Sequence, residues 1–167
     1  MKKLNFGSGK TVKVGFVNVD LHDYPGIDKA FDFEKFPYPF EDNTFDLVIC
    51  NQVLEHLKHY RKVINDLIRI TSEKGYIIIG IPNLSHLINR IYLLFGRQPL
   101  CIHLNSSHVR SFTHKSFSNM LMSLQKIKFL DCKGSLIYPL PYFIANRIKG
   151  HFIGLSGYVC YLLQKVE

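Results

Sequence analysis

Two continuous apolar runs with a helical segment between them constrain the fold most strongly. The runs Phe45–Cys50 and Tyr76–Ile81 are typical of strands that are buried on both faces of a parallel sheet. Between them, apolar residues recur at helical spacing over Gln52–Ile70. Gly75 stands where a helix-to-strand turn favours a residue that is free to adopt a positive φ. The order strand, helix, strand predicts an α/β domain with a parallel sheet.

Further segments extend this pattern toward both ends of the chain. The amphipathic stretch Leu84–Phe95 predicts a helix with two open interpretations: its apolar face packs on the sheet or roofs a pocket, or it rests on a lipid surface. Another helix is expected at about Lys115–Gln125. The remaining expected strands are Lys2–Phe6, Phe16–Asp20, Lys29–Asp32, and two late runs within 126–138 and 157–166.

A glycine pair near the start of the chain indicates a ligand loop. Gly7-Ser8-Gly9 follows the first strand, and Asp20 ends the second, where a carboxylate can accept hydrogen bonds from both hydroxyls of a ribose. A dinucleotide fingerprint would need a third glycine at Val12, and a P-loop would need one at Leu4, so neither motif is present. Only Lys10–Gly15 separate the glycines from the second strand, which leaves no room for the usual crossover helix.

Polar residues recur at the ends of consecutive strands. Gly7–Gly9, Asp20, Asp32 and Asn51 each follow or end a predicted strand. In an open α/β sheet, ligands bind in the crevice at the carboxyl ends of the strands. We therefore expect these residues to converge on one ligand.

The chain resembles the class I S-adenosylmethionine-dependent methyltransferases, and in particular their small single-domain type (methyltransferase type 11). The resemblance runs in order over roughly residues 3–120 through LNFGSGK, GFVNVDL, FPYPFEDNTFD, VLEHL, YIIIGIPN and HVRSFTHKSF. It implies a Rossmann-like fold with a mostly parallel seven-stranded sheet, an antiparallel last strand and, here, a shortened first crossover. The sequence departs from the family pattern at Thr11, where a third glycine is usual, and at Glu73-Lys74-Gly75, which replaces Pro-Gly-Gly.

The resemblance also implies a cofactor site. S-adenosyl-L-methionine would be the methyl donor and S-adenosyl-L-homocysteine the product. By position, the glycine loop matches the residues beside the methionine moiety, Asp20 the ribose-binding acid, Asp32 with Phe33 the adenine contact, and Asn51 with Gln52 the wall near the sulfonium. The full set of expected cofactor-binding residues is Phe6, Gly7, Ser8, Gly9, Asp20, Leu21, Asp32, Phe33, Asn51 and Gln52.

Three residues are candidates for the chemistry of transfer. Methyl transfer from a sulfonium chiefly requires alignment and exclusion of water, and an oxygen or nitrogen acceptor often also has to lose a proton. Histidine suits that task near neutral pH, so His56 and His108, with Arg110 beside the latter, are the catalytic candidates. The remaining histidines have no spacing that indicates a metal site, and no metal is expected.

The charge distribution bears on the acceptor. Residues 1–83 carry 11 basic and 11 acidic side chains, whereas residues 84–167 carry 10 basic and 2 acidic ones and therefore the whole net charge of +8. We expect one domain over residues 1–167, with a cofactor-binding half (1–83) and a basic, substrate-side half (84–167). This favours a small or lipid-linked, anionic acceptor, with O-methylation as the first hypothesis.

Two alternatives stay open. The basic half could dock RNA or a protein substrate, although lysine-rich patches interleaved with aromatics, as RNA binding would favour, are not evident. The chain could also be a binding protein that keeps the fold without turnover. Dispersed cysteines, with no signal peptide and no long apolar run, predict a cytoplasmic protein, with peripheral membrane contact as an option.

Overall fold

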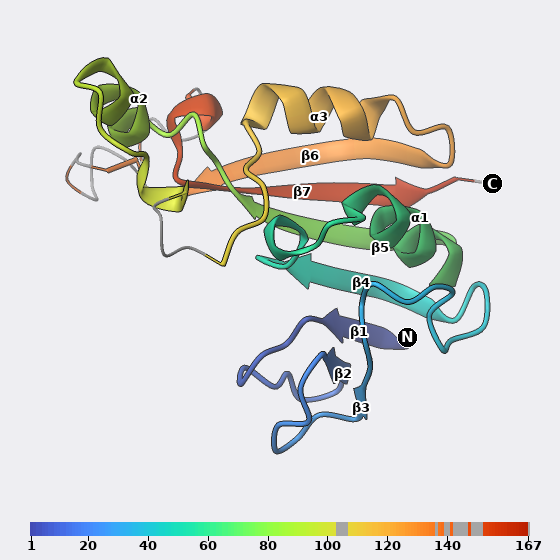
Figure 1. The fold of residues 1–167 in the computed structure, drawn as a ribbon. Helices are drawn as coiled ribbons and strands as arrows, with labels where there is room; N and C mark the ends of the chain where they lie inside the picture. Colours follow the sequence, from blue (N-terminus) through green and yellow to red (C-terminus); the bar gives the residue numbers. More distant parts are fainter. Residues whose placement is uncertain (103–106, 136, 139–140, 142–146, 148–151, 167) are drawn as a thin grey trace.

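The computed structural model describes residues 1–102, 107–135, 137–138, 141, 147 and 152–166 of the chain. Its centre is a seven-stranded sheet in the order β3-β2-β1-β4-β5-β7-β6 (Figure 1). The strands are β1 (Lys3–Phe6), β2 (Val17–Asp20), β3 (Lys29–Ala30), β4 (Phe45–Asn51), β5 (Thr71–Pro82), β6 (Ile127–Ser135) and β7 (Tyr158–Lys165).

The pairing within the sheet confirms the expected topology. The pairs β1–β2, β1–β4, β2–β3 and β4–β5 are parallel, whereas β7 runs antiparallel to both β5 and β6. β6 forms one edge of the sheet and contains a register irregularity between Phe129 and Asp131. β3 forms the other edge, and it ends at Ala30 and not at Asp32 as predicted.

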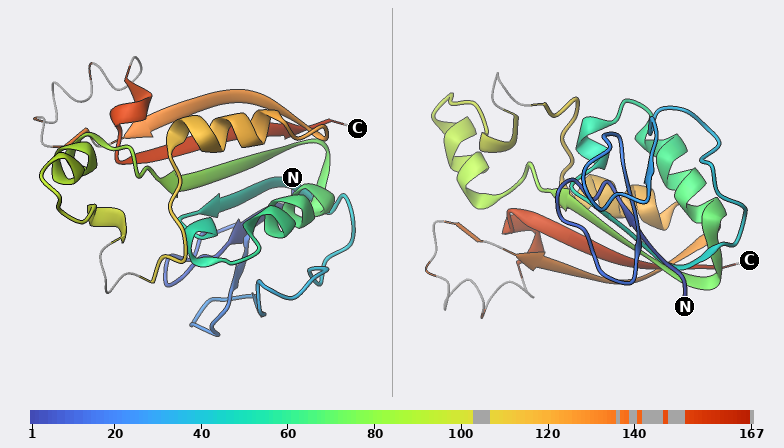
Figure 2. Two further views of the ribbon diagram at one scale, coloured as in Figure 1. Left: turned by 45° about the horizontal axis from the view of Figure 1, so that its top comes forward. Right: turned by 90° about the horizontal axis from the view of Figure 1, so that it is seen from below.

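Two helices cover one face of the sheet, which we call the covered face. They are α1 (Tyr60–Ile70) and α3 (His114–Met122), and both views in Figure 2 place them on the same side of the strands. The side chains that point to this side form the core, because apolar burial is the main driving force for packing helix on sheet. They include Leu4, Phe6, Val48, Cys50, Ile77, Ile79, Tyr161 and Leu163, none of which is more than 1% exposed.

The opposite side, which we call the open face, has no helix in the described part of the chain. It consists of Leu47 and Ile49 of β4, Tyr76 and Ile78 of β5, and Cys160 and Leu162 of β7, which alternate with the core residues along their strands. All six are partly or largely exposed. The prediction that Phe45–Cys50 and Tyr76–Ile81 are buried on both faces is therefore wrong for one face.

The first crossover is as short as expected, and no helix lies between β1 and β2. The loop instead crosses the open face beside β1, where the buried amides of Asn5 and Asn18 hold it. Asn5 Nδ2 donates to Thr11 O (3.2 Å) and Asn18 Oδ1 (3.0 Å), while Lys13 N donates to Asn18 Oδ1 (2.8 Å). In a strand that packs on a helix, these two positions would be apolar. Here they are asparagines, and their amides hydrogen-bond to the loop that takes the place of the helix.

The expected helix Gln52–Ile70 is shorter and interrupted. A 3-10 turn, η1 (Leu54–His56), precedes α1, so His56 lies in this turn and not within an α-helix. At the other end of α1 the residue with positive φ is Lys74 (φ 61°), not Gly75 as predicted. A Cβ at Gly75 would instead crowd Ser72 O and Thr71 Cγ2, so close backbone approach is what requires this glycine.

The segment expected as a helix at Leu84–Phe95 forms α2 (Leu87–Leu94), beyond the carboxyl end of β5 and the amino end of β7 (Figure 1). Within α2 itself only Asn89 is buried. Leu93, Leu94 and Phe95 are 57%, 81% and 73% exposed, so packing of this apolar face on the sheet is not observed. Two further 3-10 turns, η2 (Leu100–Ile102) and η3 (Ile153–Leu155), lie near α2.

No helix within the described ranges is both long and apolar enough to cross a membrane.

Candidate active site

The carboxyl ends of β1 and β2 bring the glycine loop and Asp20 into contact. Gly9 N donates to Asp20 Oδ2 (2.7 Å), and His22 N donates to Asp20 Oδ1 (3.1 Å). Gly7 N and Ser8 N both donate to Val19 O, which joins the loop to the second strand. The loop and the acidic residue therefore lie together as expected, and Asp20 is 9% exposed.

The two glycines of the loop are required for different reasons. Both have a positive φ, 69° at Gly7 and 54° at Gly9. A Cβ at Gly7 would overlap with the Val53 side chain, whereas a Cβ at Gly9 would have no atom within 4 Å. Gly7 thus allows the segment that leads into η1 to approach β1, whereas Gly9 has open space beside it and its positive φ favours glycine.

Two of the expected cofactor residues have buried side chains. The rings of Phe6 and Phe33 stack with centroids 3.9 Å apart and are 1% and 5% exposed. Only the backbone of these two residues could reach a ligand. Asp32 accepts from Glu34 N through Oδ1 (2.9 Å), and Leu21 is half exposed.

Asn51 and Gln52 occupy the end of β4 between two neighbouring strands. Gln52 has a positive φ (57°), and its N–H donates to Gly80 O on β5 (2.9 Å). A Cβ at Gly80 would overlap with Asn51 Oδ1, so this glycine makes room for the amide. A strained backbone of this kind at a strand end is common at functional sites.

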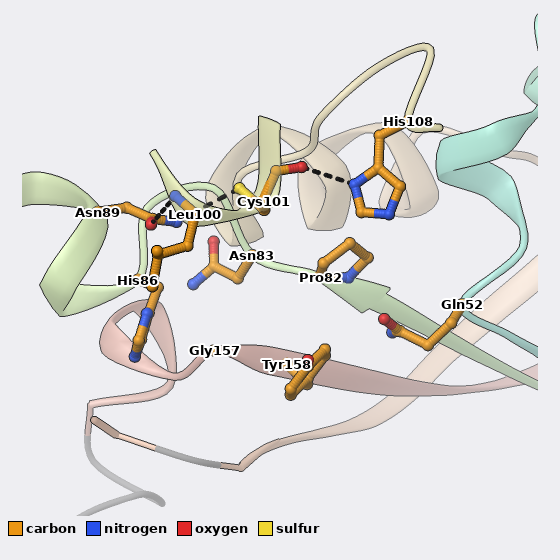
Figure 3. Close-up of a pocket in the computed structure, with 10 residues that line it drawn as sticks. All are labelled: Gln52, Pro82, Asn83, His86, Asn89, Leu100, Cys101, His108, Gly157 and Tyr158. Carbon is orange, nitrogen blue, oxygen red and sulfur yellow. Dashed lines mark hydrogen bonds between the residues drawn. The ribbon is translucent and has the colours of Figure 1, made fainter. Parts of the chain in front are cut away.

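A pocket of about 290 Å³ opens on the other side of Gln52 (Figure 3). It lies where β5 ends and β7 begins, under α2 and η2. The residues that line it are Gln52, Pro82, Asn83, His86, Asn89, Leu100, Cys101, His108, Gly157 and Tyr158.

Two buried asparagines build this pocket. Asn83 Nδ2 donates to Gly154 O (3.0 Å) and Ser156 O (2.8 Å), and its Oδ1 accepts from His114 N (3.0 Å). Asn89 Oδ1 accepts from Leu100 N (3.0 Å) and ties η2 to α2. These bonds satisfy backbone groups from three separate segments, which fixes the walls of the pocket.

The described residues that line the pocket combine apolar surface with amide and imidazole groups, and none of them is Lys, Arg, Asp or Glu. Burial lowers the pKa of His86, which favours its neutral form. His108 Nδ1 lies 2.6 Å from Cys101 O, a geometry in which Nδ1 carries the hydrogen and the lone pair of the neutral ring is on Nε2. The pocket therefore offers neutral hydrogen-bonding groups.

The three catalytic candidates come together beside η1, but only His108 lines the pocket. The rings of His56 and His108 lie 4.8 Å apart. Arg110 donates to Leu57 O (3.1 Å) and Lys58 O (2.6 Å), and its guanidinium stacks over a tyrosine ring. This guanidinium is thus bound to the backbone that follows η1.

A residue whose role could not be predicted, Glu55, completes this group. It is 1% exposed, and neither carboxylate oxygen has a hydrogen-bond partner among the residues that the structure describes. Burial raises the pKa of its carboxyl. One ligand atom from each of Glu55, His56 and His108 lies within 4.8 Å of the others. The sequence spacing gave no indication of such a cluster, because His108 comes from a distant loop.

Sequence reasoning also missed most of the pocket lining. Asn83 directly follows β5, so the rule that selected Asp20 and Asn51 at strand ends would have found it. His86, Asn89 and Cys101 lie on connections whose course the sequence does not predict. His103 lies outside the described residues.

Comparisons with known proteins agree with this architecture. Residues 2–79 match a family model described as a methyltransferase domain. An uncharacterized protein of Methanocaldococcus jannaschii is 50% identical over 50 residues, a stretch that spans 30% of this chain and only 22% of that relative.

Several solved methyltransferases share the fold at low identity. A possible histamine N-methyltransferase of Thermotoga maritima superposes with a TM-score of 0.70 at 16% identity, covering 99% of this chain and 82% of that one. An Archaeoglobus fulgidus S-adenosylmethionine-dependent methyltransferase gives 0.60 at 15%, covering 98% and 85%. The Burkholderia thailandensis 1,6-didemethyltoxoflavin-N1-methyltransferase, solved with S-adenosylhomocysteine, gives 0.62 at 12%, covering 99% and 71%.

Proposed function

The chain belongs to the class I S-adenosylmethionine-dependent methyltransferases, and from this premise we propose that it methylates a small acceptor held in the pocket of Figure 3. The observation that carries the proposal is the position of Gln52. This residue follows β4, the strand that pairs with β1 of the glycine loop on one side and with β5 of the pocket on the other. A methyl donor bound at the glycine loop and an acceptor bound in the pocket would therefore meet beside Gln52.

The cofactor-binding half, residues 1–83, is proposed to hold the donor at the ends of β1, β2 and β4. Asp20 is assigned to the ribose hydroxyls, since each of its two oxygens accepts one hydrogen bond from a backbone N–H group within the described residues and can take up further donors. Gly9, with open space beside it, is assigned to the methionine moiety. Thr11, which stands where the family usually has a third glycine, lies in the loop held by Asn5 through the Thr11 carbonyl oxygen.

The acceptor group is proposed to be a neutral hydroxyl, which keeps O-methylation as the first hypothesis. The uncharged lining suits such a group, because each buried amide and imidazole can pair with it without desolvating a charge. His108 is the proposed catalytic residue, with Nε2 as the atom that accepts the proton of the hydroxyl. The ring of His56 lies 4.8 Å from that of His108 and does not line the pocket.

An anionic or lipid-linked remainder of the acceptor is proposed to lie along α2, outside the pocket. The exposed Leu94 and Phe95 stand beside Arg90 and Arg97 on this segment. Apolar side chains with adjacent cations suit the boundary between lipid tails and anionic headgroups. Co-sedimentation with anionic vesicles tests this part, and a Leu94→Ser/Phe95→Ser variant that sediments as fully as the wild type would refute it.

Calorimetry with S-adenosylmethionine and S-adenosylhomocysteine tests the proposal as a whole. We expect both to bind, and Asp20→Ala to weaken binding by at least about tenfold through loss of charge-assisted hydrogen bonds. Asp23→Ala, which changes an exposed acid close by, is the matched control. Failure of the wild type to bind either compound would refute the proposal, and binding without turnover of any acceptor would indicate a non-catalytic binding protein.

A further inference from the structure

We propose that Glu55, His56 and His108 form a binding site for a divalent transition-metal ion at the edge of the acceptor pocket. One carboxylate and two imidazoles make the donor set, and their ligand atoms lie within 4.8 Å of one another. Mixed nitrogen and oxygen donors of this kind suit zinc, iron, cobalt and related ions.

The buried carboxylate is the observation that points to a ligand. Glu55 is 1% exposed, and within the described part of the chain both of its carboxylate oxygens lack a hydrogen-bond partner. Leaving such a group unsatisfied costs about 1–3 kcal/mol or more, so buried polar atoms without a partner are rare. A cation between Glu55 and the two histidines would satisfy both oxygens.

The backbone around the site positions the two imidazoles. Val109 N and Arg110 N both donate to Glu55 O, which fixes the loop that carries His108 against η1. His108 Nδ1 contacts Cys101 O (2.6 Å), and His56 Nδ1 contacts Ser107 Oγ (3.1 Å). Metal-binding histidines usually have their second nitrogen oriented in this way, so we assign coordination to Nε2 of both rings.

The geometry requires only a small adjustment. Metal–nitrogen bonds of about 2.1 Å in a tetrahedral site place ligand atoms roughly 3.4 Å apart. The ligand atoms, which lie within 4.8 Å of one another, therefore have to close in by up to about 1.4 Å, to which a small shift of the exposed His56 side chain can contribute.

Three protein ligands leave a coordination position open, as in catalytic metal sites. Because His108 also lines the pocket, an acceptor hydroxyl could enter that position, and the ion would then lower the pKa of the hydroxyl so that its proton passes to solvent water and not to His108 Nε2. This last clause rests on the proposed function, whereas metal binding itself does not.

Titration of the full-length protein with Co²⁺, followed by its visible absorption, tests the site in the absence of S-adenosylmethionine. We expect one ion per chain and a rise in the midpoint of thermal unfolding when it binds. Glu55→Gln, His56→Ala and His108→Ala should each weaken binding by at least about tenfold, the lower end of the loss caused even by outer-shell changes.

His59→Ala is the matched control, because His59 forms an exposed pair with Glu34 (Nδ1 to Oε2, 2.6 Å) that could also attract a cation. Its affinity should equal that of the wild type. A wild type that binds no Co²⁺, or a Glu55→Gln variant that binds it as tightly, would overturn the proposal. If circular dichroism shows that Glu55→Gln does not fold, unchanged affinity in both His56→Ala and His108→Ala would overturn it equally.

Discussion

The two faces of the sheet present similar apolar side chains to different surroundings. On the covered face, Ile77 and Ile79 are buried in the core cluster, which also contains residues of α1 and α3. On the open face, Ile49 and Ile78 pair with each other across β4 and β5 but remain partly exposed. The difference shows that the burial of a strand depends on the connections that cross it, and not on the composition of the strand alone.

The connections explain why the difference arises at this place. The crossover from β4 to β5 contains α1 and the one from β5 to β6 contains α3, and both return over the covered face. The short β1–β2 loop and the segment between β2 and β3 contain no helix. A crossover of the usual length would contain a helix that packs on this side of the sheet. Without such a helix, the open face stays exposed.

Alanine substitutions at neighbouring isoleucines should give the largest contrast. Ile79→Ala should lower the free energy of unfolding by about 2–5 kcal/mol, because it leaves a cavity in a close-packed core. Ile78→Ala, on the other side of the same strand, should cost less than half as much, because it is already in contact with solvent. Urea unfolding measures both, and equal losses would mean that the open face is covered in solution.

The ion pairs of the two faces should differ in the same direction. Asp66 accepts from Tyr38 N (2.6 Å) and Arg69 Nε (2.6 Å), and Arg69 also donates to Phe40 O (2.9 Å). Asp66→Ala should therefore cost about 2–3 kcal/mol through unsatisfied buried donors.

The control for this pair is Asp131→Ala on β6, which removes an exposed pair with Lys133 at 3.9 Å. Exposed pairs contribute little, so the change should stay within about 0.5 kcal/mol. Chemical unfolding of both variants provides the test, and a larger loss at Asp131 would contradict this ranking.

The loop that replaces the first helix should depend on its asparagines. Asn18→Ala removes acceptors and donors for Lys13 and Asn5, and should lower the free energy of unfolding by about 1–2 kcal/mol. Hydrogen exchange should then become faster at the Lys13 amide. Asn43→Ala, at an exposed turn, is the control and should leave the exchange rate of the Lys13 amide unchanged.

The smallest expected effect is a pH dependence from two partly buried histidines. Burial lowers the pKa of His86 and of His114 in the folded protein. As pH falls through the unfolded value of about 6.5, the unfolded chain takes up protons first, so stability falls below this pH and is retained above it. Unfolding curves on either side of this pH should show a smaller difference in His114→Gln, and an unchanged one in the exposed control His22→Gln.

Much of the fold could be predicted, because the apolar strand runs, the short first crossover and the motifs shared with the family can each be recognised in a short stretch of sequence. The contact between Gly9 and Asp20 followed from strand order, since both residues end neighbouring strands. The burial of the Phe33 ring did not, because it depends on stacking against a residue far away in sequence. The pocket and the Glu55 cluster depend on how the connections after β5 fold back, which strand and helix periodicity do not encode.

The irregularity between Phe129 and Asp131 has a consequence for self-association. Unpaired strands at a sheet edge can template the addition of another chain, and irregular pairing with charged side chains opposes this. β6 carries Lys128, Asp131 and Lys133 around its irregularity, and the edge strand β3 has only two residues. Growth of the sheet by strand addition, the route to fibre-like extension, is thus disfavoured at both edges of the sheet.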